Sequence, residues 1–278
     1  MRAGAEAEPR EGQDQGPTAN ARSVERLEVT VNTPAGPVTA PVEVPTGFIP
    51  VTEIVPLLRR LGEQAQALVE RTALATGQTI SCRKGCAACC RMLIPLSAPE
   101  AYRLKDTISQ MPEDRRKATL DRIAQAQHRL NAAAMLTRLS EIAESERQWS
   151  DAEMEPINRA YFALQMPCPF LVDETCSIYE DRPAACRELQ VTSPAEWCRD
   201  PVTNPVRALP VPLRVSTVLG LLWSTLVGGP IRFIPLPLAL AWSDRHADDG
   251  LRRWKGPDLL EKALDQVWRF LSQNRTED

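Results

Sequence analysis

The stretch SCRKGCAACCR, residues 81–91, carries four cysteines within nine positions: Cys82, Cys86, Cys89 and Cys90. Four more stand in MPCPFLVDETCSIYEDRPAACREL (166–189) and EWCRD (196–200): Cys168, Cys176, Cys186 and Cys198. Thiolates are soft ligands that suit zinc, iron–sulfur clusters or copper(I). Free cysteines can also serve as small core residues, an alternative with most weight at Cys198. The density of the first block nevertheless predicts a metal centre that uses all eight cysteines.

The composition of the chain limits its possible functions and its cellular compartment. The chain has 278 residues, a net charge of -3 and two histidines, His128 and His246. This charge offers no basic surface for nucleic acid, and so few imidazoles leave little for metal binding or general-base catalysis. The polar N-terminus lacks the apolar run of a signal peptide, so we expect a cytoplasmic protein with reduced thiols rather than disulfides.

One uncharged segment could be either a membrane span or a buried core helix. VSTVLGLLWSTLVGGPI, residues 215–231, contains no charged residue. A membrane span needs about 20 apolar residues, whereas this run is shorter and contains serines, threonines and a Gly-Gly-Pro break. A buried core helix is therefore the favoured interpretation, and no membrane partner is expected.

The pattern predicts a mainly α fold: an irregular helical domain, residues 25–278, around the cysteine-rich centre, after a disordered tail over 1–24. RLEVTV (26–31) and PVTAPVEV (37–44) flank NTPAG and predict a small hairpin over 26–45, whose prolines require an edge position. A helix should follow from Thr52, its cap, with Ile54, Leu58, Leu61, Ala65 and Leu68 on one face and Gly77 at its end.

Further helices are predicted beyond the first cysteine block, which should lie in a loop. Ser97 and Glu100 form a capping-box pattern. A long polar helix over 113–147 should carry an apolar stripe of Leu120, Ile123, Ala126, Leu130, Ala133, Leu136, Leu139 and Ile142. Another helix is expected over 151–164, loops with brief helices over 166–198, and C-terminal helices within 213–273, the last with Leu260, Leu264, Val267 and Leu271 buried.

The spacing limits the kind of metal centre. Side chains of adjacent residues diverge on a helix and on a strand, so Cys89 and Cys90 indicate two neighbouring sites or one multinuclear cluster. Structural zinc usually has paired C-x2-C motifs; here only Cys86 and Cys89 have that spacing, which favours an iron–sulfur cluster over zinc. Cations beside the cysteines could offset thiolate charge: Arg83, Lys84, Arg91, Arg182, Arg187 and Arg199.

Cys82, Cys86 and Cys89 also have the C-x3-C-x2-C spacing of radical SAM enzymes. The helices expected after Cys90 do not supply the alternating strands and helices of their barrel, so this interpretation is disfavoured. Asp173 and Glu174 are possible oxygen ligands, although a solvated turn is the simpler reading of this pair.

GCAACCR, CPFL, CSIYEDRPAACR and the trailing Cys198 resemble the YkgJ-type cysteine-cluster family, described as zinc- or iron-chelating, over about residues 80–200. Many members begin with C-x2-C, whereas this chain has Cys82-x3-Cys86. Tyr179, Arg182 and Pro183 match the family's I-Y-x-x-R-P. The resemblance implies metal chelation by the cysteines. A relative with this domain, the flagellin lysine N-methylase, raises protein modification as a possibility, but no glycine-rich nucleotide loop follows a strand here.

Three functions are compatible with these observations. The first is a metal- or cluster-binding protein whose reaction is unknown. The second is a cluster-dependent redox or protein-modifying enzyme, for which Cys90 and Cys198 are the candidate spare thiols. The third is an interaction module with structural zinc, which would present the long charged helix over 113–147 to a protein partner.

Overall fold

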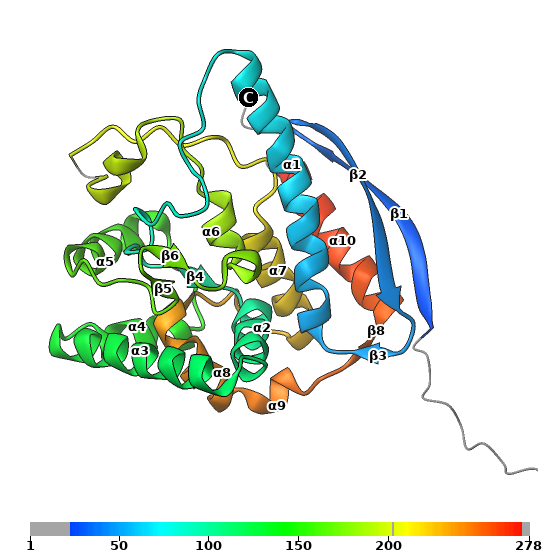
Figure 1. Ribbon diagram of the computed structural model, residues 1–278. Helices are drawn as coiled ribbons and strands as arrows, with labels where there is room; N and C mark the ends of the chain where they lie inside the picture. Colours follow the sequence, from blue (N-terminus) through cyan, green and yellow to red (C-terminus); the bar gives the residue numbers. More distant parts are fainter. Residues whose placement is uncertain (1–22, 202, 274–278) are drawn as a thin grey trace, which may run out of the picture.

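The computed structural model describes residues 23–201 and 203–273 of the chain. Most of the predicted tail over 1–24 therefore lies outside the described residues. Within them the fold is mainly α, as predicted, with a hairpin at the N-terminal end. The hairpin lies on one side of helix α1 (Val55–Ala75), and the two cysteine-bearing segments lie on the other (Figure 1).

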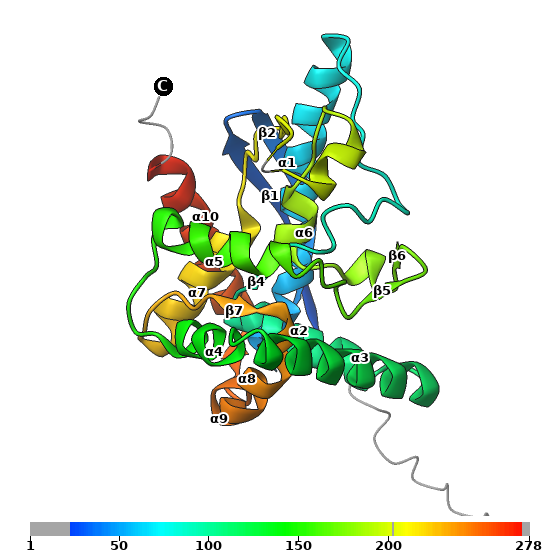
Figure 2. The same ribbon diagram turned by 90° about the vertical axis from the view of Figure 1, so that its left-hand side faces the viewer.

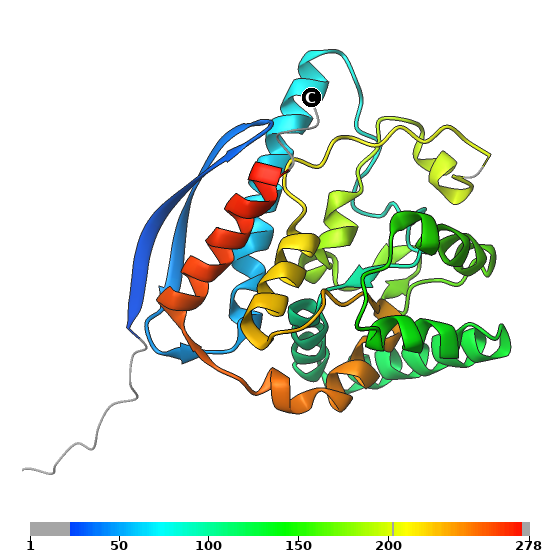
Figure 3. The same cartoon turned by 180° about the vertical axis from the view of Figure 1, so that it is seen from behind.

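The hairpin consists of β1 (Val24–Thr33) and β2 (Gly36–Pro45), antiparallel from Val24 opposite Pro45 to Thr33 opposite Gly36. Alternate side chains are buried, because successive residues of a strand face opposite sides. This buried face packs against α1 and α10 (Gly256–Gln273), as Figure 3 shows from behind. Gly256 permits the contact, because a Cβ there would lie 1.8 Å from the carbonyl oxygen of Pro45.

Helix α1 buries the predicted face but begins differently. Thr52 does not cap it; Thr52 lies in a 3-10 turn, η1 (Val51–Glu53), and Pro56 occupies the first turn of α1. Proline fits there because the first helical N–H groups need no partner within the helix. The end is as predicted: Gly77 has φ 79°, and its N–H bonds to Leu74 while that of Gln78 bonds to Ala73. This is a Schellman motif.

The central layer contains α2 (Ala98–Ser109), α7 (Val215–Val227) and α8 (Ala239–Arg245). Helix α2 begins at the predicted capping box of Ser97 and Glu100. Helix α7 buries Val218, Leu219 and Leu222 in the core that α1, α2 and α10 share. A search of residues 23–201 and 203–273 found no helix with both the length and the apolar character needed to cross a membrane.

The predicted long helix over 113–147 is wrong: it is two helices, α3 (Glu113–Ala132) and α4 (Leu136–Glu144). Ala134 has φ 55°, the N–H of Ala134 bonds to Asn131, and that of Met135 bonds to Leu130. An alanine thus holds the left-handed position of a Schellman motif that usually has glycine, which is why the sequence did not show this break.

These two helices and α5 (Asp151–Ala163) build a second core around Leu130, Leu139, Ile142, Met154 and Tyr161. Most of the predicted stripe is buried, but Leu120 and Ala133 face solvent. Most charged residues of α3 and α4 are exposed. Figure 2 views the molecule from the side on which these two helices lie.

Short elements connect these helices. The paired strands are β3 (Phe48–Ile49) with β8 (Trp254–Lys255), β4 (Pro95–Leu96) with β7 (Ile234–Pro235), and β5 (Leu171–Val172) with β6 (Thr175–Cys176). The brief helices are η2 (Tyr179–Asp181), α6 (Ala184–Glu188), η3 (Ala195–Arg199), η4 (Leu236–Leu238) and α9 (Ala247–Gly250). The second cysteine block thus has the loops and brief helices that were predicted.

Candidate metal centre

The first cysteine block is a series of turns between α1 and α2. The N–H of Cys86 bonds to the carbonyl of Arg83 at 2.9 Å, and Gly85, third in that turn, has φ 88°. A positive φ at this position is typical of a type II turn, which favours glycine. Gly85 therefore lets the chain reverse between Cys82 and Cys86 and accommodates the third residue of the C-x3-C spacing.

The second block folds through a small hairpin and a short helix. Asp173 and Glu174 both have positive φ, 48° and 55°, and connect β5 to β6, so that Cys176 pairs with Leu171. Asp173 and Glu174 are thus turn residues, and Glu174 forms an ion pair with Arg91 at 2.7 Å. Pro183 precedes α6, which carries Cys186 in its first turn.

Backbone hydrogen bonds hold the two blocks together. The N–H of Cys168 bonds to the carbonyl oxygen of Cys90 at 2.8 Å. Ser81 donates to the carbonyl of Val191 at 3.0 Å, and Val191 donates in return to the sulfur of Cys82 at 3.3 Å. Segments that are distant in sequence therefore lie side by side at the cysteines.

The thiols fall into two groups. We call Cys82, Cys86 and Cys198 the first thiol group, because they share one apolar cluster with the buried residues Ala88 and Val191. Burial, and then the neighbouring thiols of Cys82, Cys89 and Cys86, raise the pKa of Cys198 to about 11. Burial likewise raises the pKa of Cys82, against the opposing effect of the Val191 N–H.

The second thiol group consists of Cys90, Cys168, Cys176 and Cys186. Cys168 and Cys176 pack against the main core. Burial, and then the thiols of Cys176 and Cys89, raise the pKa of Cys168 to about 12. Burial raises the pKa of Cys186 well above its ordinary value, with contributions from Cys168, Cys89 and Cys176. These four side chains therefore lie within electrostatic reach of one another.

Cys89 stands between the two groups. Its thiol influences the pKa of Cys82 and Cys198 in the first group and that of all four members of the second. The thiol of Cys90 donates a hydrogen bond to Cys89, which lowers the pKa of Cys89 to about 7 and raises that of Cys90. The adjacent side chains can meet because this stretch is a turn rather than a helix or strand.

Arg182 is the predicted cation that acts most directly on the thiols. Its positive charge lowers the pKa values of four cysteines: Cys82, Cys89, Cys176 and Cys186. At Cys82, Cys176 and Cys186 this opposes the larger effect of burial, which raises the pKa. Its guanidinium lies 3.7 Å from the ring centroid of Tyr179, an arrangement favourable for a cation over an aromatic face.

The other predicted cations have different surroundings. Lys84, Arg91 and Arg187 pair with Glu180, Glu174 and Glu63 respectively, and Arg83 is exposed. Arg199 acts on Glu174 and thereby lowers the pKa of that carboxyl, after the larger effect of Arg91. Sequence reasoning missed Arg122 of α3, whose charge opposes the burial-raised pKa of Cys168 and whose Nε donates to Pro169 at 2.6 Å.

The chemistry of these donors suits a thiophilic metal. All eight cysteines are free thiols, and both blocks contribute to the same region. Within the two described ranges, however, no group of three cysteine, histidine or acidic side chains is arranged so that it could hold an ion as the side chains stand. The residues therefore fit a thiophilic metal in the type and number of their donors, and binding would require the thiols to rearrange. His246 is elsewhere, paired with Glu144.

Both cysteine blocks lie in a region that matches a known protein family. Residues 81–200 match the family CxxCxxCC, described as "Putative zinc- or iron-chelating domain". The matched range begins at the first cysteine block and ends just after Cys198, so it includes both thiol groups and Cys89. No curated protein and no solved structure matches the chain.

Proposed function

We propose that all eight cysteines bind metal in one composite centre, because residues 81–200 match the family described as "Putative zinc- or iron-chelating domain". The observation that carries this proposal is the position of Cys89, within electrostatic reach of both thiol groups. A single tetrahedral ion takes four thiolates. Eight thiols in one region therefore exceed the need of one ion and favour a multinuclear centre or two adjacent sites that meet at Cys89.

We propose an iron–sulfur cluster as the metal group, with zinc as the alternative. Cysteine thiolates are the common ligands of such clusters, and the second block has gaps of seven, nine and eleven residues rather than zinc-type C-x2-C motifs. A cluster would supply one-electron redox chemistry, and zinc would supply a structural link. Arg182 would offset part of the thiolate charge. A reducing compartment such as the cytoplasm suits this role, because disulfide formation would consume the ligands.

Metal analysis of the anaerobically purified full chain tests the proposal. We expect more than one metal ion per chain, and a broad visible absorption that bleaches on reduction if the group is iron–sulfur. A colourless protein with bound zinc would contradict the preferred cofactor and leave the ligand assignment intact. A protein that binds no thiophilic metal under these conditions would contradict both.

Single substitutions then test the arrangement. Cys198→Ser should reduce the metal content attributable to the first thiol group, Cys176→Ser that of the second, and Cys89→Ser both. Ser81→Ala, beside Cys82 but without a sulfur ligand, is the matched control and should retain the full metal content. Equal metal content in all three cysteine variants would contradict the proposed role of Cys89.

A further inference from the structure

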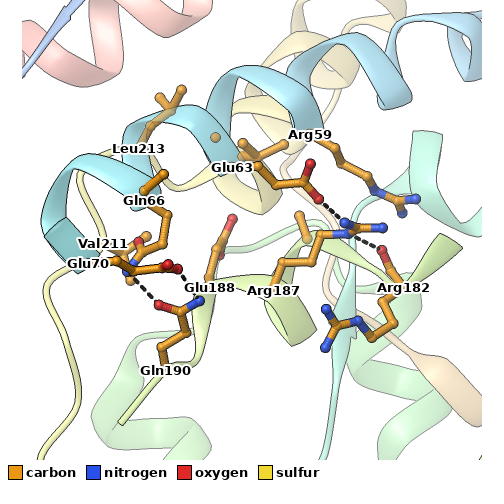
Figure 4. A pocket seen from close by; sticks show the side chains of 14 residues that line it. Arg59, Glu63, Gln66, Glu70, Arg182, Arg187, Glu188, Gln190, Val211 and Leu213 are labelled. Atoms are coloured by element: carbon orange, nitrogen blue, oxygen red, sulfur yellow. Dashed lines mark hydrogen bonds and ion pairs between the residues drawn. The ribbon is translucent and has the colours of Figure 1, made fainter. Parts of the chain in front are cut away.

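A cavity of ≈ 200 Å³ lies between α1, α6 and the segment 211–215, next to the thiols but formed by other residues (Figure 4). Helix α1 contributes one face, including Arg59, Glu63 and Gln66. Arg182 lines this cavity and also acts on the pKa of four cysteines, so the cavity and the candidate metal centre adjoin each other. Nothing in the proposed metal binding uses this space.

One end of the cavity contains two arginines, each paired with a glutamate, and an unused donor. Arg59 is only 8% exposed; its Nη2 bonds to Glu100 at 3.1 Å and its Nη1 to the carbonyl of Asp181 at 3.3 Å, while its buried Nε has no partner. Arg187 lies close by: burial, and then the charge of Arg59, lower the pKa of Arg187 to about 10. Arg187 pairs with Glu63, which also lines the cavity, so the unpartnered Nε of Arg59 is the free donor at this end. An oxyanion would accept a charge-assisted hydrogen bond from it.

The other end has an unused acceptor. Gln66 is 6% exposed and donates through Nε2 to Gln190 at 3.2 Å, and Gln190 donates to Glu70 at 2.6 Å. The amide oxygen of Gln66, Oε1, is buried and has no hydrogen-bond partner. Buried polar atoms normally have hydrogen-bond partners. A ligand ammonium or other N–H donor would satisfy Oε1 and would also be attracted to the carboxylate of Glu70.

The two ends are separated along one helix face. Arg59 and Gln66 are two turns apart, or about 10 Å along the axis at 1.5 Å per residue. Ala67, Val211 and Leu213 add apolar lining to the same cavity. We propose that this cavity binds a small zwitterion, an ω-amino carboxylate whose carboxylate lies at Arg59 and whose ammonium lies at Gln66, with the carbon chain along the apolar lining.

The test measures binding of 6-aminohexanoate to the metal-loaded full chain by isothermal titration calorimetry. Hexanoate has only the carboxylate, and hexylamine has only the ammonium. We expect 6-aminohexanoate to bind at least tenfold more tightly than either, since each lacks one of the two polar contacts. Equal binding of all three, or no binding of 6-aminohexanoate, would overturn the proposal.

Two substitutions locate the ligand. Ala67→Leu fills the cavity without removing a polar group, and Gln66→Met removes the unpartnered acceptor; each should weaken binding at least tenfold. Ala75→Leu, on the exposed surface of the same helix, is the matched control and should bind within twofold of wild type. Unchanged binding in both cavity variants would contradict this site. Metal content is measured in every sample, so failure of this proposal is distinguishable from failure of the proposed metal centre.

Discussion

At the scale of single residues, the buried carboxylate of Glu100 connects the helices to the cysteine loops. It accepts from Arg59 of α1 at 3.1 Å and from the N–H of Ala184 at 2.7 Å, and it completes the capping box of α2 with Ser97. Its side chain is 0% exposed. Since Ala184 opens α6, this one carboxylate fixes the helix that carries Cys186 relative to α1 and α2.

Substitution Glu100→Gln should therefore destabilise the protein by about 3 kcal/mol or more, because breaking a buried ion pair leaves the charge of Arg59 uncompensated. Urea unfolding measures the change. Glu43→Gln is the control, since it breaks the exposed pair of Glu43 with Arg26 and should be close to wild type. A Glu100→Gln variant no less stable than Glu43→Gln would show that the buried pair contributes little.

At the scale of elements, helix boundaries were predicted correctly where the sequence has a strong local signal for a helix end. Glycine at 77 and the pair Ser97 and Glu100 are strong local signals, and both predicted ends are present. The same left-handed termination at Ala134 has no such signal, so one helix was predicted where there are two. The cysteine blocks were visible from spacing. Tertiary packing, which a local pattern does not encode, brings Arg122 to Cys168 and places Arg59 and Gln66 in the adjoining cavity.

Ala134→Gly should stabilise the protein by about 1 kcal/mol, because a left-handed conformation costs a residue with a Cβ roughly 1–2 kcal/mol and glycine almost nothing. Thermal or urea unfolding measures this gain. Ala132→Gly, at the exposed last residue of α3, is the matched control and should destabilise by up to about 1 kcal/mol. Destabilisation by both glycines would argue against the break at Ala134.

Hydrogen bonds to Glu153 at the start of α5 predict that the stability of the protein depends on pH. Hydrogen bonds from the Ser150 N–H, Arg147 and the Ser150 hydroxyl lower the pKa of Glu153 to about 2. A carboxylate with a lowered folded-state pKa stabilises the protein above its unfolded pKa, about 4.5, and this effect disappears as the pH falls towards 2. Glu153→Gln should therefore have a lower Tm than wild type at pH 6, and the difference should shrink between about pH 4.5 and 2.

The control for this series is Glu146→Gln, an exposed position in the loop before α5. It should follow the wild-type Tm at every pH. A Glu153→Gln deficit that stays constant down to pH 2 would mean that the carboxylate charge is not what stabilises the helix start.

At the scale of the whole molecule, the cores and the cysteine loops differ in what holds them together. The main core combines the hairpin with α1, α2, α7 and α10 through apolar packing. The segments 76–97 and 166–200 have few regular elements and join each other through the contacts at Cys90, Cys82 and Val191. We predict that residues 25–278 form a single domain.

Removal of metal should therefore loosen the molecule unevenly. We expect a chelator to increase amide hydrogen exchange in 76–97 and 166–200, because metal binding free energy holds ligands from both segments together. Amides of α7 and α10, buried in the apolar core, should remain protected. Hydrogen–deuterium exchange with mass spectrometry measures both. Unchanged exchange in the cysteine segments would mean that bound metal does not organise them.

The hydrogen bond between the Cys168 N–H and the Cys90 carbonyl has a consequence for synthesis on the ribosome. Residues 91–167 separate these two partners, and a ribosome adds about 5–20 residues per second. For several seconds of translation the first four sulfurs emerge without the other four. If all eight cysteines bind metal as proposed, the centre can be completed only when translation has passed Cys198.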